Sequence, residues 1–595
     1  MYRAPVHEIS HTLKSVTGLP KAIQDGLAGE LSDDLLDAIL EEAGKFASDE
    51  VAPLSKVGDE QSTPLKDGVV TMPEGWVDLY KRWCEGGWNA LTGPAEFGGQ
   101  DLPMSLQTAA FEMWNSGSLA FGIGPTLTIG AIEAVNAHAS EALQKVYLEK
   151  LVSGEWTGTM NLTEPQAGSD LNALKTKAEP VGDGSYRIFG QKIFITYGEH
   201  DMTDNIVHLV LARLPDAPAG QKGISLFLVP KFLVNEDGSI GARNDVFCNG
   251  VEHKMGIHAS PTCTMIYGDG KFGDQPGAVG WLVGEENRGL ACMFTMMNNA
   301  RLLVGIQGVA VAEAATQKAM AYAQDRKQGR SPDYQGEGMA PIIHHPDVQR
   351  NLATMKSLTN AARAIAYNCA HAIDMEHASE GDEKNHWRGR AALLTPIAKA
   401  FSTDVGCEVS SIGVQIHGGM GYIEETGAAQ LMRDARIAPI YEGTNGIQAI
   451  DLATRKLPLN DGKVVQDYIE ELRDISDETR KRNTPKWSQI ADALDAALGE
   501  LTDSTKWLLD QMKQENKSAV LAGATPYLKL FGLSAGGCYL AKSAYSSIDH
   551  LSEERAALAG YFATNLLRET ASLSASIQNG ATSLGDMSEF LINAS

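Results

Sequence analysis

The sequence predicts an α+β protein that is mostly helical, with one β region in the middle of the chain. Two observations predict this class: apolar residues recur at helical spacing before Trp156 and after Gly284, and short β-type runs fill the stretch between them. A soft prior of about 150 residues per domain suggests roughly four domains in 595 residues. We place them at residues 1–157, 158–284, 285–457 and 458–595.

The first domain is predicted to be helical from Ser32 to about Leu151. Apolar residues there recur at the spacing of one helix face, as in Leu35, Leu36, Ile39 and Leu40. Ser32, followed by two aspartates, is a candidate N-cap for the helix that carries them. Gly- and Pro-containing breaks at 93–94 and 98–99 separate successive helices.

The second domain is predicted to be a β domain. A Gly-Asp-Gly-Ser turn at 182–185 precedes a β-type run that contains Tyr186, Ile188, Ile193 and Ile195. Residues 206–211 and 224–229 are further strand candidates, and Pro230 closes the second of them. The β region ends with the apolar residues 281–283.

The third and fourth domains are predicted to be helical. Small residues line one side of the stretch 298–324 at positions 305, 308, 312 and 315, which lets two helices approach closely. Residues 456–461 contain Pro458, Asn460 and Asp461 and indicate a linker. The helical pattern beyond it runs from about 464 to 591, with an apolar stripe at Leu472, Leu494, Leu498, Trp507, Leu508 and Leu509.

Charge and composition narrow the function classes. A formal net charge of -25 disfavours nucleic acid and anionic membrane surfaces as general partners. We see no run that approaches the roughly 18 apolar residues of a membrane span, and no signal-peptide pattern. The seven cysteines are scattered without a CxxC pair, as in reduced cytosolic proteins. We therefore expect a cytoplasmic protein without membrane insertion.

Two motifs belong to the β domain. Residues 162–170 read LTEPQAGSD, a Gly-containing loop whose hydroxyls and amides suit the polar edge of a ring, although a surface turn is equally compatible. Residues 192–198 read KIFITYG, in which an aromatic and a hydroxyl side chain could contact a flat heterocycle. Taken alone, the second motif is more simply explained as a core strand.

Two more motifs lie in the third domain. Residues 415–421 read QIHGGMG, and their glycines let a backbone approach a phosphate or merely mark a helix end; His417 is expected to be structural. Residues 441–448 read YEGTNGIQ. Glu442 follows an apolar stretch, and desolvation there would make it a general base near neutral pH. Alone, a glutamate that interacts with a helix N-terminus explains it slightly better.

Together, in this order, the motifs resemble the acyl-CoA dehydrogenase family. The resemblance covers roughly residues 32–455, and it implies the acyl-CoA dehydrogenase-like fold: an N-terminal helical domain, a middle β domain and a second helical bundle, here with an extra C-terminal helical domain. The family's usual glycine after Pro165 is Gln166 in this chain, a mild departure that we do not expect to abolish flavin binding.

The resemblance implies FAD as cofactor, bound between the β domain and the second helical domain, and Glu442 as catalytic base. It assigns the flavin loop to Met160, Leu162, Thr163 and Ser169, and the strand along the flavin ring to Phe194, Ile195 and Thr196. Arg326, Gln415, Gly418 and Gly419 resemble contacts to a neighbouring subunit's FAD, and Thr444 resembles the hydroxyl partner after the base. The acyl-CoA site would include Ser169, Arg301, Tyr441 and Gly443; no metal is implied.

The resemblance further implies α,β-dehydrogenation of an acyl-CoA to a trans-2-enoyl-CoA, with electrons passed to an electron-transfer flavoprotein. The start Tyr2-Arg3-Ala4-Pro5 and the extra helical domain resemble the bacterial subgroup that acts on 3-(methylthio)propanoyl-CoA, and also broad-range long-chain members. Cross-subunit contacts imply a homodimer, in which the chain from Val464 onward covers the face that tetrameric relatives use to pair dimers.

Several alternatives stay open from the sequence. An acyl-CoA oxidase shares this fold, base and C-terminal extension but reacts with oxygen. A flavin-containing DNA-protection protein would need a basic C-terminal domain, and this one is acidic. A purely structural helical assembly would bind no flavin. Within the acyl-CoA dehydrogenase reading, the other nearby carboxylates, Glu424 and Glu425, are expected to be solvated.

Overall fold

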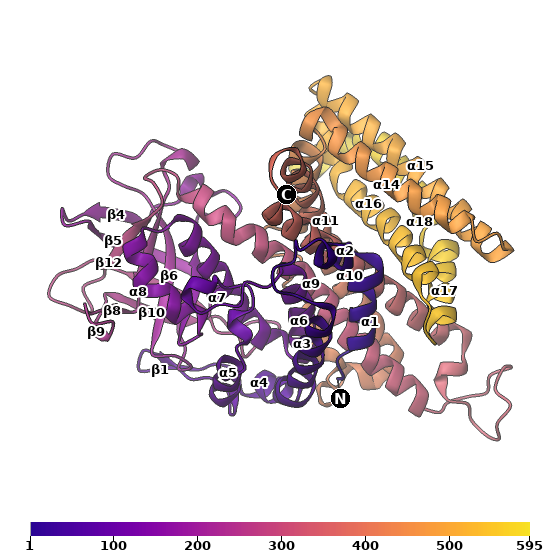
Figure 1. The fold of residues 1–595 in the computed structure, drawn as a ribbon, viewed down its shortest axis with the longest axis horizontal. Helices are drawn as coiled ribbons and strands as arrows, with labels where there is room; N and C mark the ends of the chain where they lie inside the picture. Colours follow the sequence, from indigo (N-terminus) through magenta and orange to yellow (C-terminus); the bar gives the residue numbers. More distant parts are fainter. Residues whose placement is uncertain (1, 595) are drawn as a thin grey trace. The chain divides into compact units, whose positions relative to one another are not determined.

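The computed structural model of the chain describes residues 2–594, and it separates into two units (Figure 1). The helical unit comprises the chain up to Lys45, Met104–Ser116 and the chain from Arg301 onward. The sheet unit comprises Phe46–Pro103 and Gly117–Ala300. The fold class is confirmed: helices predominate, and one β region lies in the middle of the chain.

The sheet unit is built on a mixed sheet in the order β10-β11-β5-β12-β7-β6-β3, with β4 added on β5. Neighbouring strands are antiparallel except β3 and β6, which are parallel. The strands are β3 (Trp156–Asn161), β4 (Lys177–Pro180), β5 (Ser185–Thr196), β6 (Asn205–Ala212), β7 (Ser225–Pro230), β10 (Val246–Val251), β11 (Thr262–Tyr267) and β12 (Ala278–Val283). Two short hairpins accompany the sheet: β1 (Leu65–Lys66) with β2 (Val69–Val70), and β8 (Phe232–Val234) with β9 (Ile240–Arg243).

Helices complete the sheet unit: α4 (Ser55–Gln61), α5 (Trp76–Glu85), α7 (Leu119–His138) and α8 (Glu141–Val152). Helix α7 packs so closely on β3 that a Cβ at Gly158 would lie 2.4 Å from the Ala131 side chain. The Gly158 N–H donates to the Thr128 hydroxyl at 3.1 Å across the same contact. A glycine is therefore required where the helix crosses the strand.

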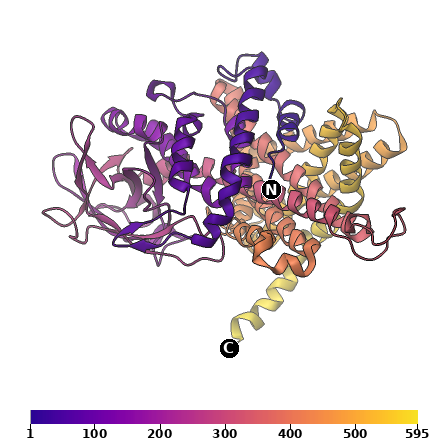
Figure 2. The same cartoon turned by 90° about the horizontal axis from the view of Figure 1, so that it is seen from below.

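The helical unit contains the long helices α10 (Pro346–Ala378) and α11 (Gly381–His417), together with most of α9 (Gly289–Asp325). The N-terminal part of the chain adds α1 (Val6–His11), α2 (Leu19–Gln24), α3 (Asp33–Lys45) and α6 (Met104–Gly117). The short helices α12 (Ala428–Ala435) and α13 (Asn445–Asp451) follow α11. The C-terminal helices are α14 (Lys463–Arg480), α15 (Pro485–Lys513), α16 (Lys517–Ser546), α17 (Ser552–Tyr561) and α18 (Glu569–Asn593). The C-terminal end of α18 projects from the neighbouring helices in Figure 2.

Local predictions in the helical unit are confirmed. The Ser32 hydroxyl accepts from the Leu35 N–H at 3.2 Å, as an N-cap of α3 does. A Cβ at Gly305 would lie 2.6 Å from the Ala398 carbonyl oxygen, and one at Gly308 would lie 2.2 Å from that of Ser402, so α9 and α11 meet backbone to backbone. In the linker, Asn460 and Asp461 adopt left-handed φ angles of 51° and 55°.

Two of the described helices are long and apolar enough to cross a membrane by length and composition: α7, and α9 within its 37 residues. Most of each apolar window, 89% in α7 and 61% in α9, is buried inside the protein. A core helix that is apolar all round passes the same test, because it contacts protein on every side.

Candidate active site

In the sheet unit, the loop 162–169 is fastened to β5. The Ile193 N–H donates to the Thr163 carbonyl at 2.9 Å. The Lys192 ammonium donates to the Leu162 carbonyl at 3.0 Å. The two β-domain motifs, which lie about 30 residues apart in the sequence, are thus brought together by main-chain and lysine hydrogen bonds.

A buried ion pair anchors this loop. Glu164 and Lys192 are almost completely buried, and their oxygen and nitrogen lie 2.9 Å apart. Glu164 also accepts from the Thr176 hydroxyl at 2.6 Å and from the main-chain N–H groups of Lys175 and Thr176. Burial alone would raise the pKa of Glu164, but Lys192 and these donors lower it overall. Burial lowers the pKa of Lys192 to about 8.

Above this anchor lies a surface that suits a flat heterocycle. The Phe194 side chain is 58% exposed, and its φ of 60° lies in the left-handed region. Thr163 and Thr196 are half-buried, Ser169 is exposed, and a Cβ at Gly168 would meet open space. Met160, on β3, and Ile195 are buried, and Leu162 is half-buried. An exposed aromatic ring beside hydroxyls fits the ring system of FAD.

In the helical unit, Glu442 lies on a tightly held loop between α12 and α13. Its φ is 54°, a left-handed conformation that is uncommon for a residue with a side chain. The Gln448 amide donates to the Glu442 carbonyl at 3.2 Å. The Thr444 hydroxyl accepts from the Ile447 N–H at 3.2 Å and so caps α13. Backbone strain held in place by several contacts is typical of a functional loop.

The carboxyl group of Glu442 lies among cations. Burial raises the pKa of Glu442, while Arg301 on α9 and Lys399 on α11 act in the opposite direction. Burial likewise lowers the pKa of Lys399 to about 8 and lowers the pKa of Arg301. A desolvated carboxylate with a raised pKa is a stronger base at neutral pH than one on the surface.

Tyr441, next to Glu442, is held to α9 by a hydrogen bond. Its hydroxyl donates to the Gln307 side-chain oxygen, and burial raises the pKa of Tyr441 well above its usual range. Gln307 is fully buried, and its amide nitrogen has no hydrogen-bond partner among the described residues. A buried amide group with an unused donor beside Tyr441 fits a site that receives a polar ligand.

The residues assigned to cross-subunit contacts lie on the surface. Arg326, Gln415, Gly418 and Gly419 are exposed, and a Cβ at either glycine would meet no atom within 4 Å. His417 is different: its ring stacks on Tyr322 at 4.4 Å, and its Nδ1 lies 2.7 Å from the Gly413 carbonyl oxygen. These contacts support the structural role predicted for it.

The alternative carboxylates, Glu424 and Glu425, are exposed to solvent, as expected from the sequence. Glu424 is 60% exposed and lies 2.7 Å from the Arg433 guanidinium, and Glu425 is exposed. Neither carries the burial that raises the pKa of Glu442. Among these three carboxyl groups, Glu442 is the one in a buried setting.

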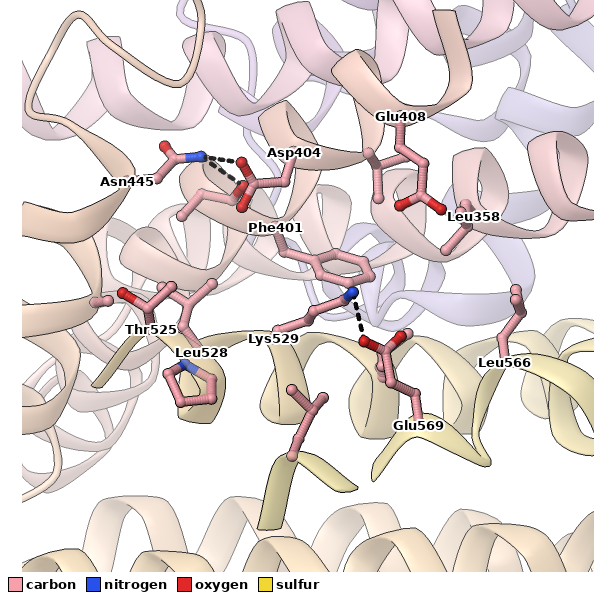
Figure 3. A pocket seen from close by; sticks show the side chains of 16 residues that line it. Leu358, Phe401, Asp404, Glu408, Asn445, Thr525, Leu528, Lys529, Leu566 and Glu569 are labelled. Atoms are coloured by element: carbon pink, nitrogen blue, oxygen red, sulfur yellow. Dashed lines mark hydrogen bonds and ion pairs between the residues drawn. The ribbon is translucent and has the colours of Figure 1, made fainter. Parts of the chain in front are cut away.

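A pocket of about 440 Å³ lies between α11 and the C-terminal helices α16 and α18, next to the start of α13 (Figure 3). Asn445 lines it, and its amide donates to the Asp404 carboxylate at 2.7 Å. On the opposite wall, the Lys529 ammonium donates to Glu569 at 2.7 Å. The extra C-terminal helices thus share a cavity wall with the loop that carries Glu442.

Family models match the chain along most of its length. The N-terminal, middle and C-terminal domains of acyl-CoA dehydrogenase match residues 33–155, 159–269 and 287–457. A model described as acetyl-CoA dehydrogenase C-terminal like matches residues 464–588. The chain belongs to the acyl-CoA dehydrogenase family. It is an oxidoreductase that uses FAD to dehydrogenate an acyl-CoA.

Individual relatives agree with this assignment. The chain is 44% identical to 3-methylmercaptopropionyl-CoA dehydrogenase of Ruegeria pomeroyi, over 92% of this chain and 91% of that protein. It is 31% identical to the broad-specificity linear acyl-CoA dehydrogenase FadE5 of Mycobacterium tuberculosis, over 95% of each. The crystal structure of Caenorhabditis elegans ACDH-11 in complex with C11-CoA has the same fold, with a TM-score of 0.76, 20% identity and coverage of 94% and 91%.

Sequence reasoning missed three side chains at these sites. Lys192 and Lys399 are buried lysines that hold the two loops, and Gln307 binds Tyr441. The sequence held a signal for the two lysines, because each lies in a mostly apolar stretch. A lysine in such a stretch is buried only when it has a hydrogen-bond or charge partner. Their partners are distant in sequence, so the pattern alone could not name them.

Proposed function

We propose that Glu442 is the base that removes the α-proton of the acyl-CoA thioester. One observation carries this proposal: Glu442 is half-buried on a strained loop, and burial raises the pKa of its carboxyl group. Two cations, Arg301 and Lys399, lie near that group and act in the opposite direction. Its own backbone N–H would polarise the thioester carbonyl and so acidify the α-carbon. Tyr441, Gly443 and Arg301 would line the acyl-CoA site beside it, with Ser169 of the flavin loop.

FAD, when bound, accepts the β-hydrogen as hydride. The ring system would lie on Phe194, Ile195 and Thr196, with polar contacts from Thr163 and Ser169 and packing from Met160 and Leu162. The exposed Arg326, Gln415, Gly418 and Gly419 would bind the adenosine diphosphate part of a neighbouring subunit's FAD, since a guanidinium suits a pyrophosphate. In the structure the Thr444 hydroxyl caps α13, and it would bind the cofactor through its own O–H.

For the substrate we propose 3-(methylthio)propanoyl-CoA or an acyl-CoA of similar length. Similarity to the Ruegeria pomeroyi relative over nearly the whole chain supports this choice. A second candidate, a broad range of linear acyl-CoAs, is favoured by the FadE5 relative, which is matched along 95% of both chains.

Anaerobic flavin reduction with a panel of acyl-CoA thioesters tests the substrate. We expect fast bleaching with 3-(methylthio)propanoyl-CoA and with acyl chains of similar length. Fast bleaching by long-chain thioesters together with none by 3-(methylthio)propanoyl-CoA would contradict the first candidate and support the second. The same assay in air, without an added acceptor, separates a dehydrogenase from an oxidase by oxygen consumption.

The biological setting is proposed on the family resemblance. An electron-transfer flavoprotein would reoxidise the flavin, and the working unit would be a cytoplasmic homodimer. The four domains would divide the chain at residues 157, 284 and 457. A light-scattering mass of a monomer with full FAD occupancy would contradict the cross-subunit contacts of Arg326 and Gln415.

A further inference from the structure

Lys399 is a fully buried lysine in the middle of α11, and its ammonium binds the loop just after Glu442. Its Nζ donates to the Gly443 carbonyl and to the Asn445 side-chain oxygen, each at 2.9 Å. Both acceptors are neutral. A buried cation bound by neutral acceptors keeps its charge for other groups nearby.

Asn445 extends this contact into a network on one face of α11. While its oxygen accepts from Lys399, its amide nitrogen donates to Asp404 at 2.7 Å and to the Ala400 carbonyl at 3.1 Å (Figure 3). The Thr403 hydroxyl lies 3.0 Å from the same nitrogen. The residues just after Glu442 are therefore fixed to one helix by several hydrogen bonds.

The charges around Glu442 come from three elements. Arg301 lies on α9; Lys399 and Asp404 lie on α11; Asp451 ends α13, with Arg455 just beyond it. Asp451 faces Arg301 and offsets part of its charge, while Asp404 acts on Lys399. Lys399 also holds the loop directly, through its hydrogen bonds to Gly443 and Asn445.

We propose that Lys399 is a positioning residue of the reaction: it holds the loop that carries Glu442 and stabilises the ionised form of that carboxyl group. The inference rests on the proposed role of Glu442 as base. It gives a role to a charged side chain at a buried site, where an uncharged donor could satisfy the same two oxygens. A purely structural anchor would need the hydrogen bonds but not the charge.

Three substitutions separate these roles. Lys399→Met removes both charge and donors, Lys399→Gln keeps a donor without the charge, and Lys399→Arg keeps the charge. Asn445→Ala loosens the loop but leaves the lysine in place. Each purified holoenzyme is first compared with the parent for thermal melting and flavin content, so that a folding defect is recognised.

The decisive measurement is the pH dependence of flavin reduction by stopped flow. With Lys399→Met and Lys399→Gln we expect slower reduction, by roughly 10–10²-fold, and an acid limb moved upward by about one pH unit, since a lost neighbouring cation raises the pKa of a carboxyl group. Lys399→Arg should leave the acid limb of the pH profile where it lies in the parent. Asn445→Ala should lower the rate of flavin reduction without moving the acid limb.

Infrared titration of the resting holoenzyme gives a second readout without turnover. The carboxyl band that disappears in Glu442→Gln should titrate at higher pH in Lys399→Gln than in the parent. An unmoved limb and an unmoved band in Lys399→Gln, in protein that folds and binds flavin, would overturn the role of the charge. Near-normal reduction by Glu442→Gln would instead overturn the proposed base, so the two failures are distinguishable.

Discussion

Two buried lysines hold the loop 162–169 and the loop that carries Glu442, and the groups that accept their hydrogen bonds differ in charge. Lys192 in the sheet unit donates to the carboxylate of Glu164, so its charge is neutralised where it sits. Lys399 in the helical unit donates to a carbonyl and an amide oxygen. Burial lowers the pKa of both to about 8. The same residue type, equally buried, thus serves as an anchor in one loop and leaves its charge to a neighbouring carboxyl group in the other.

The largest expected effect comes from removing the group that Lys399 is proposed to serve. Glu442→Gln keeps the size of the side chain but removes its basicity, so flavin reduction should fall by about 10²–10⁴-fold or more. The variant should fold, stay yellow and bind acyl-CoA. Stopped flow measures the rate of flavin reduction, and ligand titration measures acyl-CoA binding. Near-normal reduction would show that the base lies elsewhere.

Breaking the other lysine's contact should cost stability. Lys192→Met leaves the buried Glu164 carboxylate without its cation, and we expect a loss of about 3–5 kcal/mol in the free energy of unfolding. The matched control is Lys150→Met, which removes a partly exposed pair with Glu155 and should cost about 1 kcal/mol or less. Thermal or denaturant unfolding measures both. Equal losses would show that burial of the pair does not matter.

The anchoring pair also predicts a pH dependence. The pKa of Glu164 is lower in the folded protein than in the unfolded chain, so its ionisation contributes stability that is present above its usual pKa and lost as the pH falls through the folded value. In Lys192→Met burial should dominate and raise this pKa. The stability gap between variant and parent should therefore narrow on acidification, and a gap that stays constant from neutral to acidic pH would contradict the assignment.

The smallest effect is expected at the exposed surface above the anchor. Phe194 is 58% exposed, so Phe194→Ala removes little packing and should change the free energy of unfolding of the flavin-free protein by about 0.5 kcal/mol or less. Flavin retention should nevertheless weaken roughly 2–10-fold, because an aromatic contact is worth about 0.5–1.5 kcal/mol. Equilibrium dialysis of FAD measures the loss, and unchanged FAD affinity would remove Phe194 from the flavin site.

Much of the fold could be predicted because its signals are local. The Ser32 cap, the strands near 206–211 and 224–229, the small residues at 305 and 308 and the linker at 460–461 depend on neighbouring residues or on a fixed period. Glu442 could be singled out from its motif as the proposed base. The contacts made by Lys399, Lys192 and Gln307 could not, because each joins segments far apart in the chain.

The two apolar helices show what a search for unbroken apolar runs does not find. Helices α7 and α9 reach their hydropathy over windows that include polar residues. Those polar residues have partners inside the protein: the Thr126 hydroxyl on α7 donates to the Gly122 carbonyl, and Gln307 on α9 accepts from Tyr441. Composition therefore cannot distinguish a helix surrounded by protein from one surrounded by lipid.

The backbone contact between α9 and α11 bears on how the protein responds to warming. Arg301 and Lys399 stand on two helices that touch at Gly305 and Gly308 with no side chain between them. Side chains rearrange readily with temperature, whereas two main chains in contact have little room to slide without separating. We expect the spacing of the two cations, and with it the acidity of Glu442, to change little until the protein unfolds. Its upper working temperature would then be set by melting of the fold, and the pH optimum should stay nearly constant below it.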